Sequence, residues 1–266
     1  MKKRILKSIT LLLVSSLIAV TFIGCSNDTS SPSTKVDAPP AATLVMGTNA
    51  EFPPFEFVGD NGQPDGFDVA LVKEIAKRMD AEIKIENMEF KSLIGSLGNG
   101  KIDLVAAGMT VTEERKKEVD FTQAYFTANQ MIIIPTGDSI KSASDLKDKV
   151  VGVQEGTTGD IIISEDDVEV KEYNVKEVKR YKKGIDAVMD LVNDRIDAVV
   201  IDSNPAKEYV ASNEGKIVAI QSGMETEEYA MAVKKGNTEL LEKVNAALTE
   251  IKEDGTYDKL VKEYIQ

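Results

Sequence analysis

The sequence contains no histidine and a single cysteine, Cys25, among its 266 residues. Histidine is the side chain whose ordinary pKa suits proton transfer at neutral pH, and it serves most zinc sites and Ser–His triads. One cysteine cannot form an internal disulfide framework. These absences exclude most metal-dependent and histidine-dependent enzymes, and we expect neither a metal nor a cofactor.

Acidic residues outnumber basic ones throughout the chain beyond its first residues. The formal net charge is −13, and because residues 1–25 carry four basic residues and no acid, the remainder carries −17. A body this acidic repels nucleic acid and anionic lipid headgroups, so neither is an expected partner. Hydrophobic residues make up 42%, which is enough for a globular core. The length suits two compact units or one large α/β unit.

The first 24 residues are typical of an export signal. Four basic residues precede an apolar run, residues 9–24, which is short for a membrane-spanning helix. An ordinary signal peptide and an uncleaved anchor are alternatives, but Gly24-Cys25 resembles the bacterial lipobox, although Phe22 replaces its usual leucine. The resemblance implies a signal peptide over 1–24, lipid attachment at Cys25 on the extracytoplasmic face of the cell membrane, and a flexible Ser/Thr/Pro-rich tether over 25–42.

From residue 43 onward, short apolar runs alternate with segments of helical period. The predicted strands are residues 44–47, 83–87, 104–107, 150–153, 196–201 and 217–220. The predicted helices are residues 67–79, 182–193, 238–253 and 256–265. Strands separated by helices indicate βαβ units and largely parallel sheets.

One stretch of the sequence occurs twice in similar form. Leu97–Val105 reads LGNGKIDLV and Leu191–Val199 reads LVNDRIDAV. Each combines a helix end, a tight turn, a basic residue and an Ile-Asp pair that opens a buried strand. Chance similarity between α/β segments is the alternative, but with the chain length the repeat indicates two similar lobes of about 100 residues.

The segments after three predicted strands carry candidate binding groups, since ligands bind beyond the carboxyl ends of parallel strands. Gly108 to Thr110 precede a helix that begins after Thr112, so they offer backbone groups near its positive end. Arg115 could hold a carboxylate through paired N–H donors. The alternative for Arg115 is an exposed residue paired with a neighbouring glutamate.

The segments after the other two strands complement the positive charge of Arg115. Residues 156–159, Gly-Thr-Thr-Gly, form a loop suited to an anion but lack the Gly-Lys-Ser/Thr ending of a nucleotide-binding loop. Asp202 suits an ammonium group, with helix capping before Pro205 as the alternative. Together these groups fit a small zwitterion, of which an α-amino acid is the simplest.

Three aromatic residues and two prolines lie between Phe52 and Phe57. They form a stiff apolar wall that could contact a ligand's hydrocarbon part. We expect Phe55 and Phe57 to fill the core and Phe52 to face the pocket.

Several motifs of the sequence resemble those of a known family and occur in the same order and spacing as in that family. They are GTNAEFPPFEF (47–57), GFDV (66–69), AGMTVTEER (107–115), VDFT (119–122) and EDGTYDK (253–259). These segments resemble the extracellular solute-binding proteins of polar amino acid ABC importers, family 3, over residues 44–264.

The resemblance implies an α/β, two-lobed periplasmic-binding-protein fold of type II. Each lobe is then a mostly parallel sheet flanked by helices, and a two-segment hinge joins them. Residues 43–132 and 225–266 are expected to form lobe 1, and residues 133–224 lobe 2. The implied function is that of a monomeric substrate-binding component, which captures a polar L-amino acid and delivers it to the permease of an ABC transporter.

By position in the family's motifs, five residues would hold the ligand's main-chain groups. Arg115 would bind the α-carboxylate with the backbone N–H groups of Thr110 and Thr158. Asp202 and the Gly108 carbonyl would hold the α-ammonium.

Four further residues would surround the ligand side chain: Phe52 and Phe90 as walls, with Asn49 and Gln154 at positions that vary with the ligand. Relatives for cationic amino acids, and one for glutamine, have aspartate where Asn49 stands. A neutral amide cannot balance a buried cation. Asn49 and Gln154 therefore favour glutamine or cystine as the ligand, with a cationic ligand possible.

Glu51 and Glu155 could still balance a cationic ligand from nearby. The alternative function on this fold is a dehydratase for a cyclic prephenate-like acid, which would need such a carboxyl group in the cleft. Arg115 with Asp202 argues against it, because those substrates lack an α-ammonium. A lytic transglycosylase would need a further domain, and we do not expect a receptor, since no membrane segment follows up to Gln266.

Overall fold

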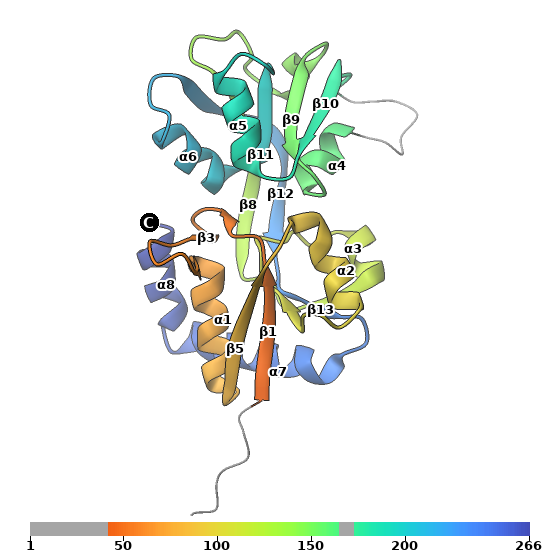
Figure 1. The fold of residues 1–266 in the computed structure, drawn as a ribbon, viewed down its shortest axis with the longest axis vertical. Helices are drawn as coiled ribbons and strands as arrows, with labels where there is room; N and C mark the ends of the chain where they lie inside the picture. The colour runs from red at the N-terminus through yellow and green to blue at the C-terminus, as the bar shows by residue number, and fades with distance from the viewer. Residues whose placement is uncertain (1–41, 165–172) are drawn as a thin grey trace, which may run out of the picture. The chain divides into compact units, whose positions relative to one another are not determined.

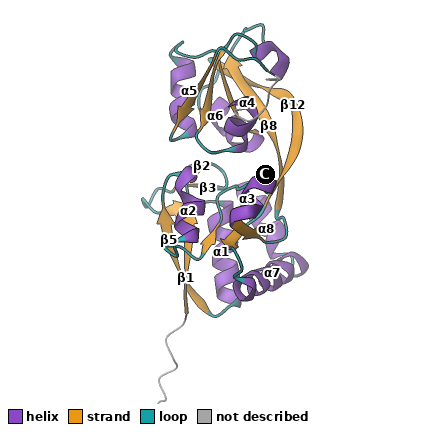
Figure 2. Cartoon of the chain, turned by 90° about the vertical axis from the view of Figure 1, so that its right-hand side faces the viewer, coloured by secondary structure: helices purple, strands orange, loops and turns teal. Residues whose placement is uncertain are grey.

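The computed structural model describes residues 42–164 and 173–266. The predicted signal peptide, Cys25 and all of the tether except Ala42 lie outside the described residues. Within the described residues, two five-stranded sheets form the centres of two lobes, and a three-stranded sheet is added to the first. Helices lie outside the strands in each lobe (Figure 2).

Lobe 1 is built on the sheet β5-β1-β6-β13-β7. Its strands are β1 (Ala42–Thr48), β5 (Ala81–Asn87), β6 (Leu104–Val105), β7 (Val119–Phe121) and β13 (Ala232–Lys234). Only β13 opposes the others in direction. The helices of lobe 1 are α1 (Phe67–Arg78), α2 (Leu93–Gly98), α3 (Glu113–Glu118), α7 (Thr238–Glu253) and α8 (Thr256–Tyr264), with a 3-10 turn at Phe90–Ser92.

Lobe 2 repeats this plan with the sheet β10-β9-β11-β8-β12. Its strands are β8 (Phe126–Pro135), β9 (Val150–Gln154), β10 (Glu177–Tyr181), β11 (Ala198–Asp202) and β12 (Ile217–Tyr229). Here β8 is the strand that runs against the rest. The helices are α4 (Thr158–Ser164), α5 (Gly184–Val192) and α6 (Ser203–Ala211), with a 3-10 turn at Ala143–Leu146. The mostly parallel two-lobed architecture is thereby confirmed.

The repeated stretch of sequence has the same structural role in both lobes. Asp103 accepts a hydrogen bond from the Val45 N–H at 2.9 Å, and its own N–H donates to the Val45 carbonyl at 2.8 Å. Asp197 makes the same two bonds with Val150, at 2.7 and 2.9 Å. The aspartate therefore attaches the strand after the turn to a parallel neighbour, β1 in lobe 1 and β9 in lobe 2, and the repeat reflects structure rather than chance.

Two long strands, β8 and β12, run from one lobe into the other and form the two-segment hinge (Figure 1). They pair antiparallel in two stretches, Met131–Pro135 with Ile217–Gln221 and Phe126–Asn129 with Thr226–Tyr229, separated by a register shift. The sequence pattern predicted β12 only over 217–220; the strand is longer because its polar second half still pairs with β8. The residues at which the chain passes between lobes stay a prediction.

Aromatic side chains pack together beside the first lobe's small sheet, β2 (Glu51–Phe52), β3 (Glu56–Val58) and β4 (Pro64–Asp65). Phe55 is fully buried and contacts Phe67 and Tyr229 edge-on. The prediction that Phe57 fills the core is wrong, because β3 turns Phe57 partly to the surface and buries Glu56 instead.

Candidate functional site

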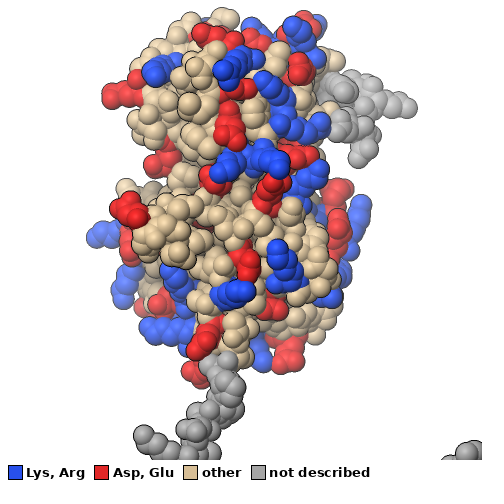
Figure 3. All heavy atoms as spheres, in the orientation of Figure 1, with Lys and Arg blue, Asp and Glu red and all other residues tan. Residues whose placement is uncertain are grey.

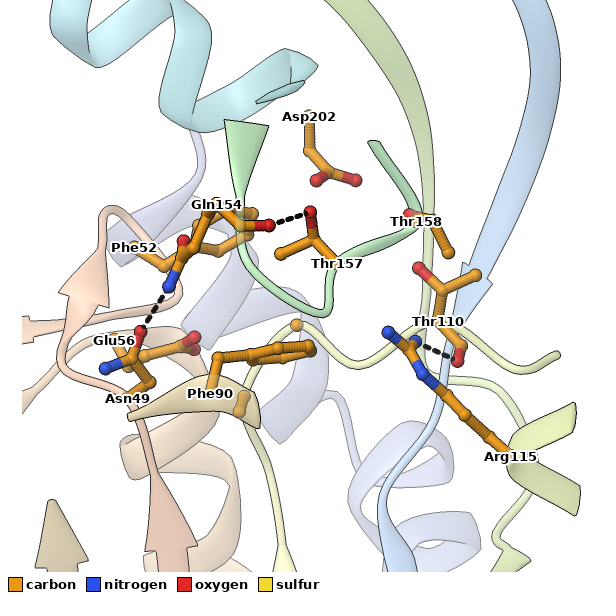
Figure 4. Close-up of a pocket in the computed structure, with 12 residues that line it drawn as sticks. Asn49, Phe52, Glu56, Phe90, Thr110, Arg115, Gln154, Thr157, Thr158 and Asp202 are labelled. Carbon is orange, nitrogen blue, oxygen red and sulfur yellow. Dashed lines mark hydrogen bonds between the residues drawn. The ribbon is translucent and has the colours of Figure 1, made fainter. Parts of the chain in front are cut away.

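A narrow pocket lies between residues of both lobes (Figure 4). All nine residues predicted as ligand-binding line it: Asn49, Phe52, Phe90, Gly108, Thr110, Arg115, Gln154, Thr158 and Asp202. Glu56, Ala107 and Thr157 also line it and were not predicted.

Arg115 is placed by the start of α3. Thr112 caps this helix by accepting a hydrogen bond from the Arg115 N–H at 3.2 Å, which fixes the first turn. The side chain is only 6% exposed, so the alternative of an exposed arginine is wrong. The glutamates beside it, Glu113 and Glu114, pair instead with lysines of the same helix.

The Arg115 guanidinium reaches both lobes. It donates to the Thr110 carbonyl at 2.6 Å and to the Gly156 carbonyl, in lobe 2, at 3.0 Å. The Phe90 ring lies 5.4 Å from its central carbon, a cation–π distance. Burial lowers the Arg115 pKa to about 10, so the group stays charged at neutral pH. A buried guanidinium that faces a cavity can hold a carboxylate.

The backbone N–H groups of Thr110 and Thr158 are available to a ligand. Thr110 forms an isolated antiparallel β-bridge with Tyr229. The flanking backbone hydrogen bonds run from the Val111 N–H to the Glu228 carbonyl and from the Ala230 N–H to the Met109 carbonyl. In this antiparallel pattern the N–H of Thr110 points away from β12. Thr158 opens α4, and first-turn N–H groups have no partner within a helix.

Asp202 ends β11 and occupies the N-cap position of α6. Its side chain makes no capping hydrogen bond, so the capping alternative does not explain it. The carboxylate accepts a hydrogen bond of 2.7 Å from the Tyr229 hydroxyl and is 5% exposed. Burial and the nearby Glu227 raise the Asp202 pKa to about 7. An ammonium ligand would therefore stabilise its charged form.

Gly108 must be glycine where it stands. Its φ is +52°, and a Cβ atom there would lie 2.9 Å from the Phe52 ring. The Gly108 N–H donates to Asp68 at 2.8 Å, and Asp68 also accepts the Tyr125 hydroxyl at 2.6 Å. These bonds fix the loop that carries the Gly108 carbonyl beside the pocket.

Glu56 is the one ionisable side chain among the three lining residues that were not predicted from the sequence. It is 0% exposed, no nitrogen or hydroxyl donor of the described residues reaches either carboxyl oxygen, and the Asp68 carboxyl group lies close enough to share a proton with it. Burial, followed by the charge of Asp68, raises the Glu56 pKa well above its ordinary value. The only available signal was the alternation of β3, which places either Glu56 or Phe57 inside; hydrophobicity favoured the wrong one.

Asn49 and Gln154 meet across the pocket from opposite lobes. The Gln154 amide donates to the Asn49 side-chain oxygen at 2.8 Å, and the Asn49 amide donates to the Met88 carbonyl at 2.9 Å. The Thr157 hydroxyl donates to the Gln154 carbonyl at 2.8 Å. Phe52 and Phe90 provide the apolar walls nearby (Figure 4).

Charged pairs between the lobes surround this pocket. Lys183 pairs with Glu51, Lys182 with Glu89, and Lys91 with Glu155, at 2.5, 2.7 and 2.6 Å. On the face drawn in Figure 3, basic and acidic side chains lie next to one another at mid-height. Glu51 and Glu155 are therefore held by lysines and are not among the residues lining the pocket, contrary to the idea that they balance a ligand's charge.

Two further properties concern only residues 42–164 and 173–266. No helix there combines the length and apolar character needed to cross a bilayer. No group of three or more histidine, cysteine, aspartate or glutamate side chains there is arranged to hold a metal ion.

The chain is similar to arginine-binding proteins over most of its length. The arginine-binding extracellular protein ArtP of Bacillus subtilis (strain 168) is 39% identical over 264 residues, 97% of this chain and 98% of that protein. The structure of an ancestral arginine-binding protein bound to arginine is 45% identical, with a TM-score of 0.80, covering 85% of this chain and 99% of that one. An ancestral arginine-binding protein bound to glutamine is 46% identical, with a TM-score of 0.78 and coverages of 84% and 98%.

These likenesses agree with the two-lobed fold. Residues 44–266 match the bacterial extracellular solute-binding proteins, family 3, and the chain belongs to that family.

Proposed function

We propose that the protein binds a free cationic L-amino acid, with arginine as the leading candidate, between its lobes and presents it to the permease of an ABC importer. The observation that carries this ligand class is Glu56, a fully buried pocket carboxyl group beside another acid, Asp68, and without a nitrogen or hydroxyl donor among the described residues. Burial favours the protonated form of Glu56 in the ligand-free protein, and a cationic ligand side chain would favour its charged form and pair with it.

The main-chain end of the ligand would lie between Arg115 and Asp202. Both side chains are almost fully buried and line the same cavity, and they carry opposite charges once Asp202 is ionised. The N–H groups of Thr110 and Thr158 and the carbonyl of Gly108 would complete this end of the site. Charge-assisted bonds of this kind contribute about 1.5–3 kcal/mol each, so several of them support binding after the cost of closure.

The side chain of the ligand would lie between Phe52 and Phe90 with its charge toward Glu56. A guanidinium suits this place because it is flat, stacks on aromatic rings and donates from several N–H groups. A neutral side chain such as that of glutamine could exchange hydrogen bonds with the protonated form of Glu56 but would not stabilise its charged form. Asn49 no longer argues for a neutral ligand by itself, because Gln154 and Met88 already engage its amide.

The ligands of the relatives support the same choice. ArtP is named for arginine, and one of the two ancestral structures holds arginine while the other holds glutamine. We extend arginine to this chain on the strength of Glu56. Glutamine and cystine, which Asn49 favoured, become comparison ligands.

The family is extracellular, which places the site outside the cytoplasm. We further propose that lipid at Cys25 attaches a monomer to the membrane surface through the tether over 25–42. The support is the Gly24-Cys25 pair after an apolar run. Closure of residues 133–224 onto residues 43–132 and 225–266, about β8 and β12, would then trap the ligand.

A dehydratase remains the second candidate because of one observation. Glu56, with its raised pKa, is a buried pocket carboxyl group that could donate a proton to a cyclic acid. Asp202 opposes this candidate, since a prephenate-like substrate offers it no ammonium. Incubation with prephenate, which has a 2-oxo acid in place of an α-amino acid, distinguishes the two: release of an aromatic acid would support the enzyme.

Calorimetry with residues 43–266 tests the binding function. Arginine is compared with citrulline, which has the same shape but a neutral urea group, and with glutamine and cystine. We expect arginine to bind at least about tenfold more tightly than citrulline, as a charged hydrogen-bonded pair does over a neutral one. Equal affinities would contradict the cationic ligand, and no binding of any amino acid would contradict the function itself.

A further inference from the structure

Glu227 lies behind the pocket, on the hinge strand β12, and is 8% exposed. One carboxylate oxygen accepts the Thr110 hydroxyl at 2.6 Å and the Thr158 hydroxyl at 2.7 Å. The other accepts the Gln130 amide at 3.2 Å. Thr110 belongs to lobe 1 and Thr158 to lobe 2, so a single carboxylate oxygen joins the two lobes. We call these two hydroxyl bonds the Glu227 bridge.

The two hydroxyl bonds of the Glu227 bridge differ in whether a movement of the lobes would break them. Thr110 is fixed to β12, because backbone bonds of 2.9 and 3.1 Å join Val111 to Glu228 and Met109 to Ala230. Glu227 and Thr110 therefore stay together when the lobes move. Thr158 starts α4, which packs on β9 and β11 of lobe 2. The bond from Thr158 is thus the one that opening of the lobes would break.

The register shift of β12 lies on the lobe 2 side of Glu227. It falls between Gln221 and Thr226, and the stretch that includes Glu227 pairs with Phe126–Asn129 of β8. A change of angle at this irregularity would move Thr158 with its sheet while Glu227 and Thr110 keep their contact.

We propose that Glu227 is a positioning residue whose bond to Thr158 holds the lobes closed and aligns the Thr110 and Thr158 N–H groups on the ligand carboxylate. The alignment of the N–H groups on a ligand rests on the proposed function, whereas the closing effect, the stabilisation of the closed arrangement of the lobes, does not. A carboxylate only accepts hydrogen bonds, so one oxygen can hold two hydroxyl donors without competition. Such bonds are shorter and stronger than neutral ones, and burial keeps water from replacing them.

The charge of Glu227 also affects the ligand-binding groups. It favours the charged form of Arg115 and contributes to the raised pKa of Asp202. Glu227 does not itself line the cavity. Its effect on a ligand is therefore indirect, through the two threonines and these charges.

Three variants test the Glu227 bridge: Glu227→Gln, Thr158→Val and, as the matched control, Glu228→Gln. Glu228 is the exposed neighbour on the same strand and loses the same charge. Stopped-flow dissociation of arginine is expected to be about tenfold faster or more in Thr158→Val and unchanged in Glu228→Gln. In Glu227→Gln we expect a smaller acceleration, because the amide oxygen can still accept both hydroxyls but no longer carries a negative charge. Wild-type rates in both bridge variants would overturn the inference.

The double variant separates positioning from direct contact. If the Thr158 hydroxyl acts through Glu227, combining Thr158→Val with Glu227→Gln accelerates dissociation no more than Thr158→Val alone. Effects that multiply would show that the two side chains act independently, which contradicts the bridge. Unchanged circular dichroism shows that the fold is retained.

Small-angle X-ray scattering of the ligand-free protein keeps the test separate from the proposed function. We expect a larger radius of gyration in Thr158→Val and Glu227→Gln than in Glu228→Gln and the wild type. If the wild type binds no amino acid but this difference is found, the proposed function fails and the bridge stands. Identical radii in all four proteins would overturn the closing effect.

Discussion

The Gln154 side chain donates a hydrogen bond of 2.8 Å to the Asn49 side chain, so a residue at the end of β9 meets one just after β1 across the pocket. This bond joins the lobes without using a charge. The structure thus combines a neutral contact between the lobes with a deeper acid, Glu56, in the same cavity.

Asn49→Asp is predicted to increase selectivity for arginine over citrulline. The introduced carboxylate would still accept the Gln154 amide but would add a negative charge to a pocket that already holds Glu56 and Asp202. A cationic ligand offsets that charge, whereas citrulline does not. Without ligand, the added charge should lower the melting temperature. Competition calorimetry and thermal unfolding check both effects, and unchanged selectivity would place Asn49 out of reach of the ligand's charge.

Glu56→Gln is predicted to weaken arginine by at least about tenfold while leaving citrulline within a few-fold of its original affinity. The substitution keeps the shape of the side chain and removes only its ability to become a carboxylate. Without ligand, the variant should be at least as stable as the wild type, because a buried group of raised pKa is lost. Equal losses for the two ligands would indicate a packing role for Glu56 instead of a charge role.

Local signals explain what the sequence could predict at the site. Thr112 followed by two glutamates marks a helix start, so the position of Arg115 in its first turn is decided within four residues. Asp202 follows an apolar run, and a strand that ends there must point its last residues to the sheet's edge. Such assignments need no knowledge of distant contacts.

Glu56 and Glu227 could not be found in this way. In β3 the alternation leaves the inward side undecided, and burying a glutamate in place of a phenylalanine becomes favourable only beside a charged pocket. Glu227 meets partners 117 and 69 residues away in sequence, Thr110 and Thr158. Its stretch of β12 looks like a polar loop because four of its residues, 225–228, are polar.

Arg115→Ala is predicted to reduce arginine binding to the level of agmatine, which is arginine without its carboxylate. The guanidinium would no longer pair with the carboxylate, and removing one partner of a buried charged contact costs about 2–5 kcal/mol. Lys116→Ala, on the exposed side of the same helix, is the matched control and should bind normally. Circular dichroism must stay unchanged. Retained arginine affinity in Arg115→Ala would remove this residue from the site.

Asp202→Asn is predicted to weaken arginine far more than 5-guanidinopentanoate, which lacks only the α-ammonium. The amide keeps a bond with the Tyr229 hydroxyl but cannot balance a cation. Calorimetry with the two ligands isolates the ammonium contact. Similar losses for both would clear Asp202 of that role and assign it to the support of Tyr229.

The pH dependence of the ligand-free protein should follow the buried acids. Burial and Glu227 raise the Asp202 pKa to about 7, and burial raises the Asp68 pKa to about 6. Both groups bind protons more tightly folded than unfolded, so their stabilising contribution is present at low pH and is lost as the pH rises through these values. We therefore expect the melting temperature to fall from about pH 4, the unfolded pKa of an aspartate, to about pH 7, with a shallower fall in Asp202→Asn.

Arginine binding should show the opposite trend, because the ligand's ammonium requires the charged form of Asp202. Affinity is predicted to rise over the same pH range, with protons released on binding as Asp202 ionises. Calorimetry in buffers of different ionisation enthalpy measures this release, and Asp202→Asn should reduce it. Because Glu56 also lies in the pocket with a raised pKa, Glu56→Gln should remove a separate share of the release. If the wild type released no protons between about pH 6 and pH 8, Asp202 would already be ionised in the free protein. The assignment of Asp202 as the group that loses its proton when the ligand's ammonium binds would then be wrong.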